Sequence, residues 1–155
     1  MNATRVLIIL GAALVLGAVN FSILGKEGIK RNGEVIYLDL APIDPRSVMQ
    51  GDYMALRFRL AQQITARPVD SESAFAPLTL DARRIASLAP AGAPSTLKIR
   101  YRMRNGSVWL GTNAFFFEEG SEARFAPARY GEFRIDPQSG EAVLVGLRDA
   151  NLNPL

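Results

Sequence analysis

Histidine and cysteine are both missing from this chain of 155 residues. Their absence excludes Ser-His-Asp and Cys-His nucleophilic sites and the usual zinc constellations. Lysine is scarce as well, because fifteen of the eighteen basic residues are arginine. The bases that remain for acid–base chemistry are carboxylates, three lysines and the tyrosines. We therefore expect neither a metal ion nor a cofactor.

Charge is missing from one long segment near the start of the chain. Residues 6–24 are nineteen residues without a charged side chain, bracketed by Arg5 and Lys26. As a helix this run would be about 28 Å long, close to the roughly 30 Å of a hydrocarbon core. The pattern predicts a membrane anchor within residues 1–25, a polar stalk at 26–34 and a separate domain at 35–155.

A cleaved signal peptide is the alternative interpretation of this segment. Cleavage requires small residues at the first and third positions before the cut, and the pairs Leu16/Ala18 and Ala18/Asn20 fit poorly. The sequence therefore favours an uncleaved anchor. Counting Lys and Arg on either side would leave the long tail in the cytoplasm, but long domains translocate largely regardless of that count.

Alternation of polar and apolar residues predicts strands beyond the stalk. A strand at 35–40 places Ile36 and Leu38 on one face, and a strand at 52–60 buries its even-numbered apolar residues. Between them, Asp44-Pro45 suits a helix start, so 46–50 can form one turn that Gly51 ends, or 44–47 a type I turn. We expect a surface loop at 62–77. Residues 78–88 fit two strands or a short helix.

Two hairpins are predicted in the second half of the chain. Asn105-Gly106 favours a type I′ turn, which pairs Arg102 with Trp109 and turns Met103 toward the core. Arg102 would then lie across the Trp109 ring. The second hairpin joins 131–136 to 141–147. Strands joined by short turns predict an all-β domain, a small antiparallel barrel or sandwich, preceded by one N-terminal transmembrane helix.

Several short motifs occur in an order that resembles the GDYXXLXY family of membrane-anchored bacterial proteins. They are DPRS at 44–47, GDY at 51–53, RYR at 100–102, NG at 105–106, FFFEEG at 115–120, ARYGE at 128–132 and GLRD at 146–149. The last Tyr of the family's name is Phe58 here, so no role for a hydroxyl carries over to that position. The resemblance implies a domain outside the bacterial inner membrane, often encoded beside multi-span membrane proteins.

The motif corner is the first candidate binding surface. We expect Asp52 on the inward face, accepting hydrogen bonds from backbone N–H groups or an arginine. The sequence favours the alternative, a rigid structural turn, because each residue type has a local structural reason to be there. Its residues are Asp44, Arg46, Gly51, Asp52, Tyr53, Arg148 and Asp149.

A basic face on the predicted strand is the second candidate. Arg100, Arg102 and Arg104 occupy alternate positions along it. Arg57 and Arg59 could add further positive charge to this face. Such a face would suit phospholipid headgroups or an anionic polymer. The sequence favours the alternative, a solvated strand face paired with the glutamates at 118, 119, 122 or 132. The expected compartment argues against nucleic acid.

These observations favour a non-enzymatic binding or accessory module for a multi-span membrane protein. The alternative is an envelope hydrolase that uses Ser47 with Lys98, or the carboxylates of Asp44 and Asp52. The Ser–Lys spacing does not match the signal-peptidase pattern, and both aspartates have sufficient structural roles in turns.

Overall fold

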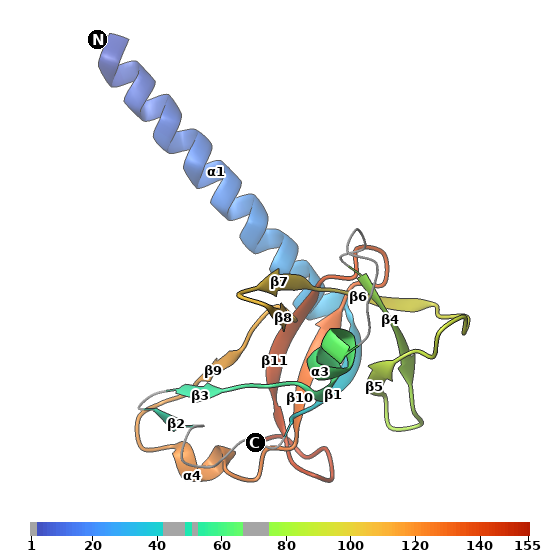
Figure 1. Cartoon of the computed structure of the whole chain (residues 1–155). Coiled ribbons are helices and arrows are strands. Elements are labelled where there is room, and N and C mark those ends of the chain that lie inside the picture. Colours follow the sequence, from blue (N-terminus) through green and yellow to red (C-terminus); the bar gives the residue numbers. More distant parts are fainter. Residues whose placement is uncertain (1–2, 42–48, 51–52, 67–74) are drawn as a thin grey trace.

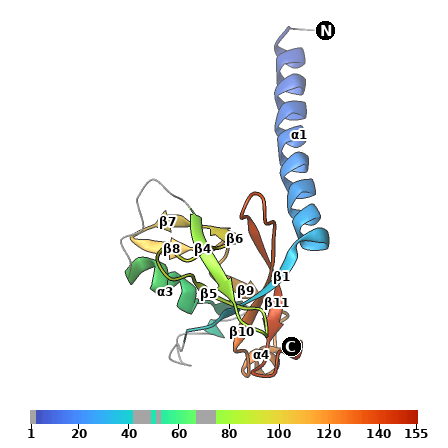
Figure 2. The same ribbon diagram turned by 90° about the vertical axis from the view of Figure 1, so that its right-hand side faces the viewer.

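The structure is a computed structural model that describes residues 3–41, 49–50, 53–66 and 75–155. One long helix, α1 (Ala3–Asn32), projects from a β-rich domain (Figures 1 and 2). At about 1.5 Å per residue it is some 45 Å long, more than a hydrocarbon core requires. It is long and apolar enough to cross a membrane, and none of its described residues is buried. The segment expected as a stalk continues this helix as far as Asn32.

The main sheet has six strands in the order β11-β10-β1-β5-β4-β6. Neighbouring strands are antiparallel except β1 and β5, which pair in parallel. The strands are β1 (Glu34–Asp39), β4 (Phe75–Leu80), β5 (Ile85–Leu88), β6 (Leu97–Arg100), β10 (Tyr130–Ile135) and β11 (Ala142–Arg148).

The sheet curls into a half-barrel, because the edge strand β6 contacts the turn between β10 and β11 at the opposite edge. The Arg100 N–H donates to the Gly140 carbonyl at 2.7 Å. A β-bulge between Glu132 and Phe133 adds local twist to the same hairpin. The concave side encloses the core, whose fully buried side chains include Ile36, Leu38 and Phe133.

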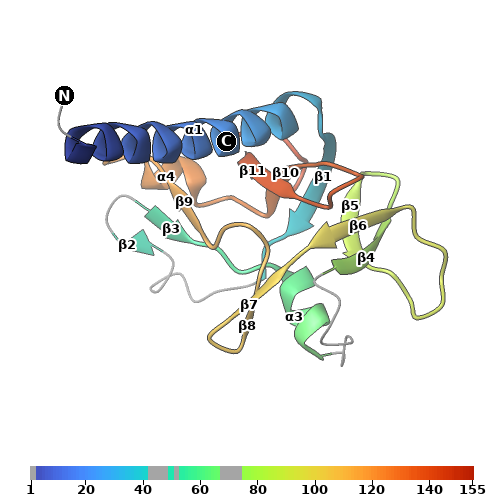
Figure 3. The same cartoon turned by 90° about the horizontal axis from the view of Figure 1, so that it is seen from above.

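Among the described residues, two smaller sheets and two short helices accompany the main sheet (Figure 3). One sheet holds β2 (Met49–Gln50), β3 (Tyr53–Ala55) and β9 (Ala114–Phe116), and the other pairs β7 (Arg102–Arg104) with β8 (Ser107–Trp109). Helix α3 (Arg59–Ala66) packs against β8 and β5, and α4 (Glu122–Phe125) places Phe125 between Phe115 and Phe117.

The predicted fold class is therefore correct only in part. The domain is a curled mixed sheet with helices, whereas a purely antiparallel all-β barrel or sandwich was predicted. The crossover from β1 to β5 makes the parallel pair. Helix α3 lies within this crossover, where a loop was expected.

The predicted strand at 52–60 is also partly wrong. Its apolar residues Met54, Leu56, Phe58 and Leu60 are buried as expected. However, the strand ends at Ala55 and a helix begins at Arg59. Leu60 and Ile64, four residues apart, give this helix one buried face.

Other expectations between 46 and 88 have mixed outcomes. The surface loop expected at 62–77 instead contains most of α3 and the start of β4. Residues 78–88 contain the end of β4 and all of β5, so the two-strand alternative is correct. Met49 and Gln50 form a strand, which contradicts a helical turn through residue 50.

Both predicted hairpins are present. Asn105 and Gly106 have φ angles of 49° and 73°, as a type I′ turn requires, and Arg102 pairs with Trp109. The direction of Met103 was predicted wrongly, because it is 58% exposed. The cation–π partner of Trp109 was also wrong: the Arg104 guanidinium carbon lies 4.9 Å from the ring centroid. Arg104 is the diagonal neighbour of Trp109 across the hairpin, within reach of a long side chain.

Candidate functional site

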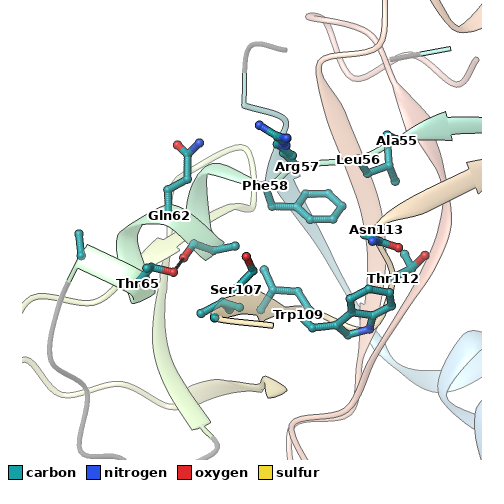
Figure 4. A pocket seen from close by; sticks show the side chains of 15 residues that line it. Ala55, Leu56, Arg57, Phe58, Gln62, Thr65, Ser107, Trp109, Thr112 and Asn113 are labelled. Carbon is teal, nitrogen blue, oxygen red and sulfur yellow. Dashed lines mark hydrogen bonds between the residues drawn. The ribbon is translucent and has the colours of Figure 1, made fainter. Parts of the chain in front are cut away.

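An open groove of about 750 Å³ lies between α3 and the β7–β8 hairpin (Figure 4). We call it the α3–β8 groove. Its floor is apolar and is made by buried Leu56, Phe58 and Leu110. Half-buried Val108 and Trp109 complete its apolar lining. Polar side chains form its rim: Arg57, Gln62, Thr65, Ser107, Thr112 and Asn113.

Local sequence explains why the groove stays open. Helix α3 turns Leu60 and Ile64 into the core and leaves Ala61, Gln62 and Thr65 on the groove side. The small side chain of Ala61 leaves space between the helix and the hairpin. The Leu56 N–H donates to the Asn113 carbonyl at 2.7 Å, which fixes the floor to the segment before β9.

The chemistry of this groove suits binding. Among the described residues that line it, Arg57 is the single ionisable side chain. Thr65 Oγ1 already donates to the Ala61 carbonyl at 2.9 Å. An apolar floor with amide and hydroxyl groups at its rim suits a ligand that is itself partly apolar and hydrogen-bonding.

Four residues of the predicted motif corner lie outside the part of the chain that the structure describes. They are Asp44, Arg46, Gly51 and Asp52. Tyr53 is described. It begins β3 and is half-buried, and its ring centroid is 5.8 Å from that of Phe116 on β9. Tyr53 and Phe116 are register partners and Phe116 is 74% exposed, so the two rings lie on a face of the small sheet that is open to solvent at Phe116.

Arg148 and Asp149, also assigned to that corner, have structural partners elsewhere. Arg148 Nε donates to Glu132 Oε2 at 2.5 Å, and Arg148 Nη2 contacts the same oxygen. Asp149 Oδ1 accepts the N–H groups of Asn151 and Asn153, and the side-chain amide of Asn153 donates to Oδ2. These hydrogen bonds, chiefly those from Asn153, lower the pKa of Asp149.

Sequence reasoning missed the role of Glu132. It was considered only as a partner of the basic face, yet it is 6% exposed and the one buried charged residue among those described. The position of Glu132 in the second predicted hairpin could have indicated this ion pair. Glu132 and Arg148 lie two positions apart in the register of β10 and β11, which puts them in diagonal contact.

The residues of the predicted basic face, Arg100, Arg102 and Arg104, are all exposed. Their strand is interrupted at buried Tyr101, so Arg100 ends β6 and the other two belong to β7. Arg100 lies 3.9 Å from Glu141, a residue that was not among its expected partners. Arg59, on α3, pairs with Asp39 at 3.0 Å.

Of the four residues considered for hydrolysis, the structure describes Lys98. Lys98 is exposed and its Nζ lies 4.7 Å from the centroid of the Phe75 ring. Ser47, Asp44 and Asp52 lie outside the described residues. Within the described ranges, no group of three or more acidic residues is placed to hold a metal ion.

Comparison with known proteins identifies the family. The family model described as GDYXXLXY protein matches residues 15–147, so the chain belongs to this family. The matched segment includes most of α1 and nearly the whole β-domain. Searches of curated proteins and of solved structures give no match.

Proposed function

We propose that this protein is a single-span membrane protein whose β-domain is a non-catalytic binding module for a multi-span membrane protein. In this proposal α1 is the uncleaved anchor and the domain lies outside the bacterial inner membrane. The α3–β8 groove holds a segment of the partner. The observation that carries the proposal is this groove, on a domain attached directly to an apolar helix. Its floor is apolar, and Arg57 is the one charged residue of its polar rim among the described residues.

The size and chemistry of the groove support a polypeptide ligand. About 750 Å³ lies within the usual range for ligand sites and can hold several side chains. Leu56, Phe58 and Val108 offer contacts to apolar side chains of the segment. The amides of Gln62 and Asn113 can exchange hydrogen bonds with its backbone, since each amide both donates and accepts.

The attachment of the domain supports a partner in the same membrane. Helix α1 enters β1 through the single residue Gly33, and the Gly33 N–H donates to the Ile29 carbonyl at 2.8 Å. The domain therefore stays close to the end of the anchor (Figure 2). A loop that leaves a multi-span protein at the same membrane surface would be within its reach.

Photo-crosslinking of the full-length protein in its native membrane tests the proposal. A photoreactive side chain replaces Gln62 at the groove, and in a matched control it replaces Gln138, an exposed glutamine in the β10–β11 turn. We expect position 62 to give one discrete adduct with an integral membrane protein and position 138 to give none. Equal labelling from both positions, or no adduct from position 62, would contradict the proposal.

Filling the groove provides a second test. Ala61→Trp places a large ring in the groove, and Ala123→Trp makes the same change at an exposed position on α4. With the photoreactive residue moved to Ser107, we expect Ala61→Trp to remove the adduct and Ala123→Trp to preserve it. An adduct that survives Ala61→Trp would show that the partner binds elsewhere.

A further inference from the structure

A second cavity, of about 360 Å³, lies between α1 and the strands β6 and β7. Three cationic side chains line it, Lys26 from the helix with Arg100 and Arg102 from the strands. Ser22, Trp109 and one carboxylate, Glu141, are the other polar or aromatic residues that line it. Three positive charges against one negative charge leave the cavity strongly cationic.

Glu141 neutralises this cavity only weakly. Its carboxylate oxygens lie 3.7 Å from Lys26 Nζ and 3.9 Å from Arg100 Nη1, both longer than a good charge-assisted hydrogen bond. No carboxylate among the described residues pairs with Arg102. An ammonium group has three donors and a guanidinium five, so most donors in the cavity remain available to a ligand.

The cavity lies at the point where α1 changes from apolar to polar. Ser22 is within the uncharged run that ends at Leu24, and Lys26 is the first charged residue after it. Figures 1 and 2 show the β7–β8 hairpin on the side of the domain from which α1 projects. With residues 6–24 in the hydrocarbon core, the cationic cavity would therefore lie at the level of the lipid headgroups.

We infer that this cavity binds the headgroup of an anionic phospholipid in the leaflet next to the domain. Lys26, Arg100 and Arg102 contact the phosphate oxygens, since cationic pockets beside membrane helices suit anionic headgroups. Trp109 lies at the wall of the cavity, at the depth where indole rings favour the membrane interface. The inference rests on the proposed insertion of α1 and needs no partner in the α3–β8 groove, although Trp109 lines both the groove and this cavity.

Trp109, the sole tryptophan of the chain, is a built-in reporter for this site. The full-length protein is reconstituted in nanodiscs that contain either phosphatidylglycerol or phosphatidylcholine brominated high in the acyl chain, at equal mole fraction. We expect the brominated anionic lipid to quench Trp109 more strongly, with the excess decreasing at high salt. Equal quenching by the two lipids would overturn the inference.

Variants separate a binding role from a structural one. Arg100→Gln and Arg102→Gln should each reduce the preference for the anionic lipid by about fivefold. Glu141→Gln should increase it, because it removes the one competing carboxylate, and loss of a merely structural ion pair would not do so. Arg124→Gln, an exposed arginine on α4, should leave the preference unchanged. An unchanged preference in both arginine variants, or a decrease in Glu141→Gln, would contradict the site.

Two further outcomes distinguish the possible failures. Inorganic phosphate added to phosphatidylcholine nanodiscs should not alter Trp109 emission, and a saturable response would show a soluble anion site and overturn the assignment to lipid. Protein that does not co-elute with the discs would overturn both α1 insertion and the lipid site. Protein that inserts and selects anionic lipid but gives no groove adduct would contradict only the proposed function.

Discussion

The β7–β8 and β10–β11 hairpins have similar sequence patterns and different structural environments. In β10 the side chains of Phe133 and Ile135 are fully buried, and in β7 all three side chains are exposed. The β10 strand pairs on both sides, with β1 and β11, whereas β7 pairs with β8 alone. Alternation therefore predicts which side chains share a face, but a second layer must cover that face before it becomes core.

Removing an aromatic ring from each region should give the largest contrast. Phe133→Ala should lower the free energy of unfolding by about 4 kcal/mol, because the ring is fully buried and lies edge-on to Phe58 at 5.3 Å. Phe116→Ala, on the exposed edge of β9, should change it by less than about 0.5 kcal/mol. Urea unfolding of the full-length protein in detergent, followed by Trp109 fluorescence, measures both. Similar losses would show that the exposed edge also supports folding.

The ion pair in the buried hairpin should give the next largest effect. Glu132→Gln should cost about 3 kcal/mol of unfolding free energy, because it leaves the Arg148 guanidinium half-buried without its carboxylate. The double variant with Arg148→Met should recover part of that loss, since no unpaired charge then remains. A double-mutant cycle measures the coupling. Additive losses would contradict a cooperative pair.

Alanine at the turn glycines compares the two hairpins directly. Gly140 and Gly106 both have positive φ angles, so alanine is strained at either position. At Gly140 a Cβ would also lie 2.9 Å from the Lys98 carbonyl oxygen, whereas at Gly106 it would meet open space. We expect unfolding free energies lower by about 2 kcal/mol for Gly140→Ala and about 1 kcal/mol for Gly106→Ala. Equal losses would indicate that the return of β6 to this turn contributes little.

A pH titration should give the smallest difference between the hairpins. The Ser139 hydroxyl, with the Gln138 N–H, lowers the pKa of Asp136 below its ordinary value of 3.8. Because the folded pKa is the lower one, the turn is stabilised above pH 3.8 and loses that stabilisation as the pH falls through the folded pKa. NMR titration of the carboxyl carbon measures the shift. Ser139→Ala should return the pKa toward 3.8, and an unchanged value would assign the shift to the backbone donors.

Local patterns predicted much of this fold correctly. The β1 strand, both hairpins and the buried apolar residues between 54 and 60 follow from alternation and turn chemistry. The helix α3 was missed because its residues Arg59 and Leu60 continue the alternation of the preceding strand. The parallel pairing of β1 and β5 joins segments far apart in sequence, and no local pattern indicates it.

The candidate site was less predictable than the fold. The α3–β8 groove depends on how α3 packs against β8, so the helix had to be known before the groove was visible. The cationic cavity likewise combines Lys26 with Arg100 and Arg102, more than seventy positions later. The sequence indicated the basic face of Arg100, Arg102 and Arg104. Only the folded chain shows that Lys26, near the end of α1, lines the same cavity as Arg100 and Arg102.

The direct passage of α1 into β1 couples the helix mechanically to the domain. A Cβ at Gly33 would lie 2.5 Å from the Ile29 carbonyl oxygen and 3.0 Å from that of Ile135, so the chain passes through a space that admits only hydrogen. Without a flexible linker, the helix acts as a lever arm. In the proposed membrane arrangement, a change in its tilt would swing the whole domain across the membrane surface, and a rotation about its axis would change the direction in which the groove faces.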